Sequence, residues 1–173
     1  MRVMLPVSAI VVSFNTKALL RECLAGLADC AQLLVVDNAS QDGSADMVAA
    51  EFPRAVLLRN EQNVGFGRAN NQAIRQADQP FVLLVNSDCA PEPGAIEALL
   101  EAMRPESVAA AGPLLLHPDG SSQDSAASRL TLWRVLCEQA MLDKLFRRSR
   151  LFGGYWLTRG LLAKDPVGPH EVP

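Results

Sequence analysis

Acidic and amide side chains follow two apolar stretches of this sequence, at the points where those stretches end. Asp37 comes directly after "LLVV", and Asn86, Ser87 and Asp88 come directly after "FVLLV". Carboxylate and amide oxygens bind hard divalent cations, and an acid at a strand end commonly accepts hydrogen bonds from a nucleoside. The same residue types are also common in turns, where they hydrogen-bond to their own backbone. A ligand site and a simple turn are therefore the two interpretations of this pattern.

Four strand-helix units position these residues. Each unit is an apolar, β-branched run followed by apolar residues at helical spacing. The strands are predicted over 7–14, 32–37, 55–60 and 81–85, and the helices over 17–29, 44–52, 66–77 and 94–104. Apolar strands without polar alternation belong to a parallel sheet with helices on both faces. The predicted fold is therefore α/β, with an open, mostly parallel, Rossmann-like sheet.

Ligands of open parallel sheets bind beyond the carboxyl ends of the strands. The segment after the first strand, "SFNTKA", contains no glycine, so it is neither a dinucleotide-binding turn nor a phosphate-binding loop. The same absence argues against a nucleotidyltransferase. A diphosphate would then need a divalent cation, Mg²⁺ or Mn²⁺, held by Asp88. Asp37 would accept hydrogen bonds from the base or sugar of the nucleotide.

Two loop features have simpler interpretations. Asp42 and Gly43 are predicted to form a turn and to begin the following helix. Gly65 is predicted to take a positive φ rather than to make room for a ligand.

Composition narrows the class of protein. The 173 residues are 49% hydrophobic with a net charge of -3, so nucleic acid is not an expected partner. The four cysteines form no CxxC pair and the two histidines have no metal-ligand spacing, which indicates free thiols in a reducing cytoplasm. No apolar segment is long enough to span a bilayer. We therefore expect a cytoplasmic location.

The character of the chain changes after residue 120. We expect an α/β domain over 1–120 and a helical segment and linker over 121–173. Residues 129–150 interleave large apolar side chains with basic ones, which is typical of an amphipathic helix. Such a helix packs in the core or lies on an anionic bilayer, so contact with the inner face of the membrane is one expectation.

Four motifs in order, "VSAIVVSFN", "LLVVDNASQDGS", "NVGFGRANNQAI" and "LLVNSD", resemble the family 2 glycosyltransferases of the glycosyltransferase A fold. The resemblance is strongest to the bacterial rhamnosyltransferase-like subgroup and covers about residues 7–120. It implies an inverting transfer of a sugar, such as rhamnose, from a UDP- or dTDP-linked donor. The implied acceptor is a saccharide or a lipid-linked saccharide in cell-surface polysaccharide synthesis.

The resemblance also assigns residues, with two departures from the family pattern. Asn86 stands where the family usually has a first acid, so Asp88 alone supplies negative charge. Many relatives place an arginine at the position of Asn70, and here Arg68 lies two residues earlier. The implied nucleotide-binding residues are Ser13, Asn15, Asp37, Asn38, Gly65, Arg68, Asn70 and Ser87, and the implied metal ligands are Asp88 and Asn86.

The resemblance implies that the general base lies downstream of Pro173, so residues 1–173 alone are expected not to transfer sugar. A strand from that downstream part would pair beside residues 81–85. Without it, an exposed apolar edge is expected to favour a homodimer. The alternative to an enzyme is a noncatalytic nucleotide-binding module or an inactive piece of a longer transferase.

Overall fold

A computed structural model of the protein describes residues 4–117, 119–121, 123 and 131–146. By its internal contacts the chain divides into two units, residues 1–98 and 99–173. A domain boundary at residue 120 remains a prediction from composition.

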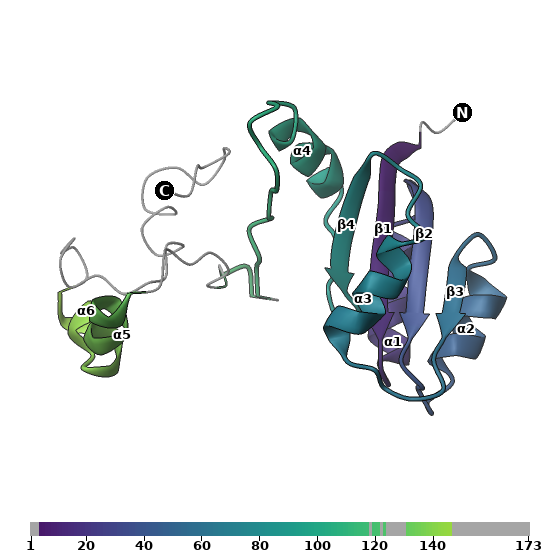
Figure 1. The fold of residues 1–173 in the computed structure, drawn as a ribbon, viewed down its shortest axis with the longest axis horizontal. Helices are drawn as coiled ribbons and strands as arrows, with labels where there is room; N and C mark the ends of the chain where they lie inside the picture. Colours follow the sequence, from purple (N-terminus) through teal and green to yellow (C-terminus); the bar gives the residue numbers. More distant parts are fainter. Residues whose placement is uncertain (1–3, 118, 122, 124–130, 147–173) are drawn as a thin grey trace. The chain divides into compact units, whose positions relative to one another are not determined.

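The first unit is built on four parallel strands in the order β3-β2-β1-β4 (Figure 1). The strands are β1 (Leu5–Ser13), β2 (Cys30–Asp37), β3 (Val56–Arg59) and β4 (Phe81–Asn86). The helices that alternate with them are α1 (Lys17–Gly26), α2 (Ser44–Glu51) and α3 (Phe66–Ile74), and α4 (Ala95–Ala102) follows β4. The α/β fold class and the four strand-helix units are confirmed.

Strand register brings the strand ends to one level. Ser13, the last residue of β1, pairs with Asp37 of β2, and Val12 pairs with Asn86 of β4. Asp37 in turn pairs with Arg59 at the end of β3. The acidic and amide residues of separate strands are therefore neighbours at the carboxyl edge of the sheet.

Helices cover both faces of the sheet centre. On one face, Ala69 and Ala73 of α3 pack against the apolar side chains of β1 and β2, and all of them are buried. Their small side chains let α3 lie close to the strands. Figure 1 shows α1 on the opposite face, where it buries Leu20, Cys23 and Leu24.

The apolar strand β4 departs from the expectation of two covered faces. Val82 and Leu84 are 45% and 50% exposed. They pair with Ser8 and Ile10 of β1 and so lie on the α3 side of the sheet. Because α3 packs over β1 and β2, it leaves this side of β4 uncovered. The prediction that both faces of β4 are buried, which came from an apolar run without polar alternation, was therefore wrong for this side.

The loops after β1 and β2 are joined by hydrogen bonds. The Asn15 N–H donates to Ser40 Oγ at 3.0 Å, and the Gln41 N–H donates to Asn15 Oδ1 at 2.8 Å. Asn15 and Ala39 both have positive φ, of 55° and 66°. These left-handed residues are tolerated because the bonds between the loops hold their backbone in place.

Asp42 joins the starts of two helices. Its Oδ2 accepts from the N–H of Lys17, the first residue of α1, at 2.9 Å. Its Oδ1 accepts from the N–H of Ser44, the first residue of α2, at 3.0 Å and also from the Ser44 hydroxyl. Gly43 lies between them with a φ of 79°. The predicted turn and helix start are confirmed, and the carboxylate serves α1 as well as α2.

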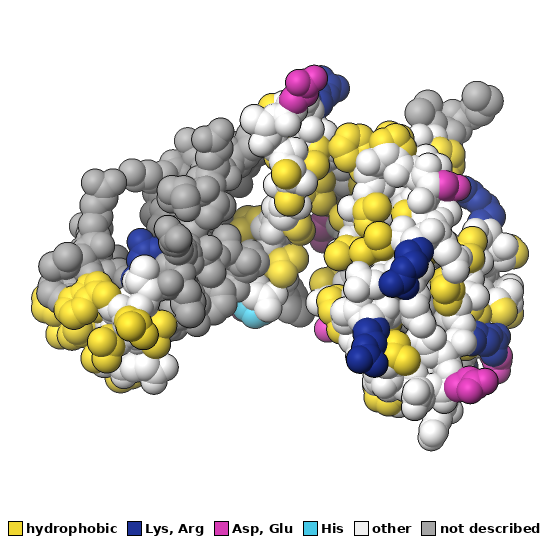
Figure 2. All heavy atoms as spheres, viewed as in Figure 1, with side chains coloured by type: hydrophobic (Ala, Val, Ile, Leu, Met, Phe, Trp, Pro, Cys, Tyr) yellow, Lys and Arg dark blue, Asp and Glu magenta, His cyan; other side chains and the backbone are white. Residues whose placement is uncertain are grey.

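The second unit contains α5 (Leu132–Gln139) and α6 (Leu142–Leu145). The single amphipathic helix predicted here is interrupted at Met141, whose φ is 56°. Residues 129, 130 and 147–150 of that prediction lie outside the described residues. Every helix in the described part of the chain is too short or too polar to cross a bilayer. Figure 2 shows hydrophobic side chains gathered over α5 and α6.

Asp42→Ala should lower the free energy of unfolding by about 1 to 2 kcal/mol, because capping groups of this kind contribute about 1 kcal/mol per helix start. Urea denaturation measures this loss. Asp42→Asn, which keeps one acceptor oxygen, should lose less. Equal losses in the two variants would argue against the double cap.

The same bonds should make this contribution depend on pH. The hydroxyl of Ser44 is the main cause that lowers the pKa of Asp42 below its ordinary value of 3.8. The stabilisation is then complete above the unfolded pKa and declines as pH falls through the folded pKa. The stability difference between wild type and Asp42→Ala should therefore shrink from about pH 5 to about pH 3. A constant difference over that range would contradict this origin.

Candidate functional site

A cavity of about 350 Å³ opens at the carboxyl edge of the sheet. It is lined by Val12, near the end of β1, together with polar side chains and two aromatic rings. The remaining lining residues are Phe14, Thr16, Leu19, Asn38, Asn63, Phe66, Asn86, Ser87 and Asp88. The cavity therefore lies at the sheet edge where ligands of open parallel sheets bind.

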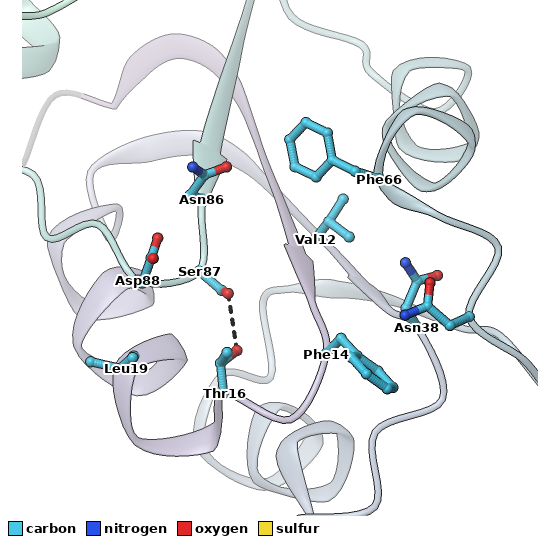
Figure 3. Close-up of a pocket in the computed structure, with 10 residues that line it drawn as sticks. Val12, Phe14, Thr16, Leu19, Asn38, Phe66, Asn86, Ser87 and Asp88 are labelled. Carbon is cyan, nitrogen blue, oxygen red and sulfur yellow. Dashed lines mark hydrogen bonds between the residues drawn. The ribbon is translucent and has the colours of Figure 1, made fainter. Parts of the chain in front are cut away.

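The polar side of the cavity is formed by the end of β4. Figure 3 shows Asn86, Ser87 and Asp88 there, on the opposite side of Val12 from Asn38. Asn86 and Asp88 are exposed and Ser87 is buried. A carboxylate and an amide oxygen are hard donors, which suit Mg²⁺ or Mn²⁺ better than softer metals.

Few side chains at this position could act as metal ligands. Among the described residues, no group of three or more His, Cys, Asp and Glu side chains could hold a metal ion. A cation at this site would depend on Asp88, with Asn86 beside it, and would take its other oxygens from water and ligand. Magnesium and manganese are commonly held in this way, so the residues fit such an ion.

The aromatic side of the cavity was missed by sequence reasoning. Phe14 and Phe66 are 47% and 56% exposed although they are large and apolar. Phe14 follows the last residue of β1 and was assigned to the strand, and Phe66 begins α3. Their rings border the cavity, so they offer flat apolar surfaces to a ring-shaped ligand.

Asp37 is the last residue of β2, is not among the residues that line the cavity, and is 4% exposed. Its Oδ2 accepts from the Ser40 N–H at 3.0 Å. Its Oδ1 is buried and has no hydrogen-bond partner among the residues that the structure describes. A buried carboxylate oxygen without a donor is costly, so this atom requires an N–H or O–H from a ligand or from water.

Asn38 reaches the cavity and is held from behind. It is 2% exposed, and its Oδ1 accepts from Asn60 Nδ2 at 2.9 Å. The Asn60 amide also exchanges two hydrogen bonds of 3.0 Å with the Gln72 amide on α3. The position of Asn38 is therefore fixed by β3 and α3 together.

A row of three hydroxyl groups crosses from β1 to β4. Ser13 Oγ lies 3.1 Å from Thr16 Oγ1, and Thr16 Oγ1 donates to Ser87 Oγ at 3.0 Å. Ser13 is fully buried and lies behind Thr16, which lines the cavity in its place. Sequence reasoning selected Ser13 and missed Thr16, because side-chain direction at the strand end is not readable from spacing.

Six of the eight predicted nucleotide-binding residues are absent from the cavity lining: Ser13, Asp37 and the four described next. The amide oxygen of Asn15 accepts a hydrogen bond from the Gln41 N–H. Arg68 is exposed on α3. Asn70 is buried and donates to the Phe66 carbonyl at 3.0 Å. Gly65 has the predicted positive φ, of 85°, and no described atom lies within 4 Å of a Cβ built on it. A nucleotide contact by any of them stays a prediction.

The four cysteines are free thiols, as predicted. Burial raises the pKa of Cys23 to about 12, so its thiol is neutral near pH 7. It donates to the Asn86 carbonyl at 3.5 Å and thereby supports the end of β4. Burial likewise raises the pKa of Cys30 to about 11.

The family model for glycosyl transferase family 2 matches residues 8–163. This range extends beyond residues 7–120, over which the sequence motifs resemble the family. The chain is 33% identical over 148 residues to an N-acetylglucosaminyl-diphospho-decaprenol L-rhamnosyltransferase of Mycobacterium tuberculosis, covering 79% of this chain and 48% of the relative. The chain thus spans about half the length of that relative.

Solved structures share the fold of part of this chain. A mannosyltransferase from Pyrobaculum calidifontis, in complex with GDP-Man and Mn²⁺, matches with a TM-score of 0.54 and 25% identity over 60% of this chain and 33% of its own. S. aureus TarS in complex with UDP matches with a TM-score of 0.51 and 25% identity, over 56% and 31%. Both share the fold over the part of this chain that they cover. With a family match over most of its length and this shared fold, the chain belongs to glycosyl transferase family 2.

Proposed function

We propose that the whole protein transfers a sugar, with inversion, from a nucleoside diphosphate donor to an acceptor hydroxyl, and that the cavity receives the donor. The observation that carries the proposal is the division of the cavity into two ends. Asp88 and Asn86 offer oxygen ligands at one end, and Phe14 and Asn38 offer a ring surface and an amide at the other. A nucleoside diphosphate has the same division between an anionic part and a flat base.

The polar end would receive the diphosphate. Asp88, with Asn86 beside it, would hold Mg²⁺ or Mn²⁺, whose charge offsets that of the leaving diphosphate when the ion is bound. Ser87 adds a hydroxyl donor at the same end. The similarity to the mannosyltransferase in complex with GDP-Man and Mn²⁺ supports this assignment.

The aromatic end would receive the nucleoside. The exposed face of Phe14 can contact the base, and the unpartnered Oδ1 of Asp37 needs a hydrogen-bond donor. Uracil and thymine both carry an imide N–H that a carboxylate can accept. A UDP- or dTDP-linked donor meets that need, and the likeness to TarS in complex with UDP supports it.

The sugar and acceptor are proposed from the mycobacterial relative, which is named as a rhamnosyltransferase acting on a diphospho-decaprenol-linked sugar. We propose rhamnose as the sugar and a saccharide or lipid-linked saccharide as the acceptor. The reaction would take place at the cytoplasmic face of the membrane, in synthesis of cell-envelope polysaccharide.

Inversion also requires a general base near the acceptor hydroxyl. Asp119 is poorly suited to that role, because the Ser121 N–H and hydroxyl both donate to its Oδ1. The hydroxyl is the main cause that lowers the pKa of Asp119. A carboxylate outside residues 1–173 remains the proposed base.

A noncatalytic nucleotide-binding module is the second candidate. The observation that favours it is Asn86, which leaves Asp88 as the single carboxylate lining the described cavity. Such a module would bind a nucleoside diphosphate without turnover in any longer version of the chain.

Asp88→Asn should weaken manganese-dependent binding of UDP by about thirtyfold or more, because removing the charged partner of a bound ion costs about 2 kcal/mol or more. Titration calorimetry with and without Mn²⁺ measures the effect. Asn86→Asp supplies the matched variant, since a second carboxylate should strengthen the dependence on manganese. The assignment fails if Asp88→Asn binds UDP with the metal dependence of the wild type.

Asp37→Ala should weaken UMP and UDP binding by a similar factor, with or without Mn²⁺, because Asp37 is assigned to the nucleoside. Asp88→Asn is the control, as it should affect UDP in the presence of metal and leave UMP unchanged in its absence. Calorimetry of the two nucleotides distinguishes these patterns. A loss in Asp37→Ala that is confined to UDP with metal would place Asp37 in the metal site instead.

Membrane contact through residues 129–150 is proposed from apolar exposure and charge. Leu132, Leu136 and Leu145 are 86%, 61% and 74% exposed. The segment has a net charge of +4, from six basic and two acidic side chains. The protein should sediment with anionic phospholipid vesicles at low salt and dissociate as salt is raised.

Leu132→Ser with Leu136→Ser should reduce that sedimentation. Leu116→Ser is the matched control, since Leu116 is 54% exposed and lies outside the segment. A protein that stays in the supernatant at low salt would mean that the segment packs against other parts of the protein.

A further inference from the structure

Thr16 occupies the N-cap position of α1, but its side chain makes no capping hydrogen bond in the described structure. Threonine at this position usually accepts from a backbone N–H of the first helical turn. Here Asp42 accepts from the Lys17 N–H, and the Thr16 hydroxyl donates instead to Ser87, at the end of another strand. The Thr16 hydroxyl therefore hydrogen-bonds to Ser87, which lines the cavity, and does not cap α1.

The hydroxyl row has a defined direction. A hydroxyl has one proton, and Thr16 donates its proton to Ser87 Oγ. The 3.1 Å contact between Ser13 and Thr16 must then be donated by Ser13. Ser87 accepts from Thr16 with a lone pair, so its own proton remains available to an acceptor in the cavity that it lines.

Thr16 also completes the support of the loop that carries Asp88. The Cys89 N–H donates to the Asn86 carbonyl at 3.0 Å and closes the turn. Gly26 at the end of α1 lies so close to Pro91 that a Cβ there would be 3.0 Å from the proline ring. These contacts hold the two ends of the loop, and the bond from Thr16 holds its centre at Ser87.

We propose that Thr16 is a positioning residue of the donor site, which acts through Ser87. It orients the Ser87 hydroxyl so that this group donates to an oxygen of the bound diphosphate, and it keeps the adjacent Asp88 in place. This inference rests on the proposed function of the cavity. A hydrogen bond from a hydroxyl to an anionic oxygen is stronger than a neutral one, and a preceding donor in the row reinforces it.

The test compares Thr16→Val, which keeps the shape and loses the hydroxyl, with Thr16→Ser, which keeps the hydroxyl. Thr16→Val should bind UDP with Mn²⁺ about fivefold more weakly, the effect of losing one hydrogen bond, whereas Thr16→Ser should stay within about twofold of wild type. Uridine, which has no phosphate, should bind the wild type and both variants equally. Equal losses for UDP in the two variants, or an equal loss for uridine, would overturn the inference.

A double-mutant cycle with Ser87→Ala separates action through Ser87 from a direct contact. If Thr16 acts through Ser87, Thr16→Val should add little to the loss caused by Ser87→Ala. Additive losses would mean that Thr16 contacts the ligand itself or supports the fold generally, and would overturn the role assigned here.

Amide hydrogen exchange of residues 86–90 without nucleotide tests the positioning role independently of binding. Exchange should be faster in Thr16→Val than in wild type and unchanged in Thr16→Ser. If the wild type fails to bind UDP with Mn²⁺, the proposed function fails, and the exchange comparison still decides whether Thr16 holds the loop. Unchanged exchange in Thr16→Val would overturn the positioning role.

Discussion

The pairing of β1 on both its edges is the constraint on which the site depends. β1 pairs in parallel with β2 and with β4, and its residues from Val7 to Ser13 are all buried. A shift of one residue in either register would turn its apolar side chains from one face to the other. Burial on both faces therefore fixes the register, and the register fixes the relative heights of Asp37 and Asn86.

Beyond the strand ends, side-chain hydrogen bonds hold the loop backbone in place of the hydrogen bonds of the sheet. Asn15, Ser40 and Asp42 hydrogen-bond to backbone N–H groups of neighbouring loops. These bonds satisfy donors that the helix starts and turns would otherwise leave unpaired. Side chains therefore hold the backbone of the loops after β1 and β2, which no strand or helix holds. Preorganisation of this kind lowers the entropy that a ligand must lose on binding.

The sequence was sufficient to predict those structural features that depend on local periodicity. The strands and helices of the first unit were predicted to within about three residues at their ends, because buried strands and amphipathic helices have distinct patterns. Asp37 and Asp88 were selected as candidate site residues because each lies where an apolar run ends. Exposure of one side of β4 was missed, since it depends on which strands α3 covers. The interruption at Met141 was missed because the apolar spacing continues through it.

Side-chain direction was the other limit of prediction. Ser13 and Thr16 are both small hydroxyl residues near one strand end, and only the structure shows that Ser13 is fully buried while Thr16 lines the cavity. Phe14 has the composition of a strand residue and is nevertheless 47% exposed. In each case the deciding fact is the turn of the backbone after Ser13, where Asn15 has a positive φ. Left-handed residues other than glycine leave no clear pattern in sequence.

The two strand-end acids differ in burial, and this difference separates the roles proposed for them. Asp37 is 4% exposed, whereas Asp88 is exposed and borders the cavity. Magnesium gives up its water reluctantly and keeps several water ligands when bound, so it needs a carboxylate with open space beside it. Asp88 has that space and Asp37 does not. A buried carboxylate oxygen is satisfied instead by a single N–H or O–H donor. The sheet thus places two carboxylates at one edge, and under the proposed function their burial suits Asp88 to a cation and Asp37 to a hydrogen-bond donor.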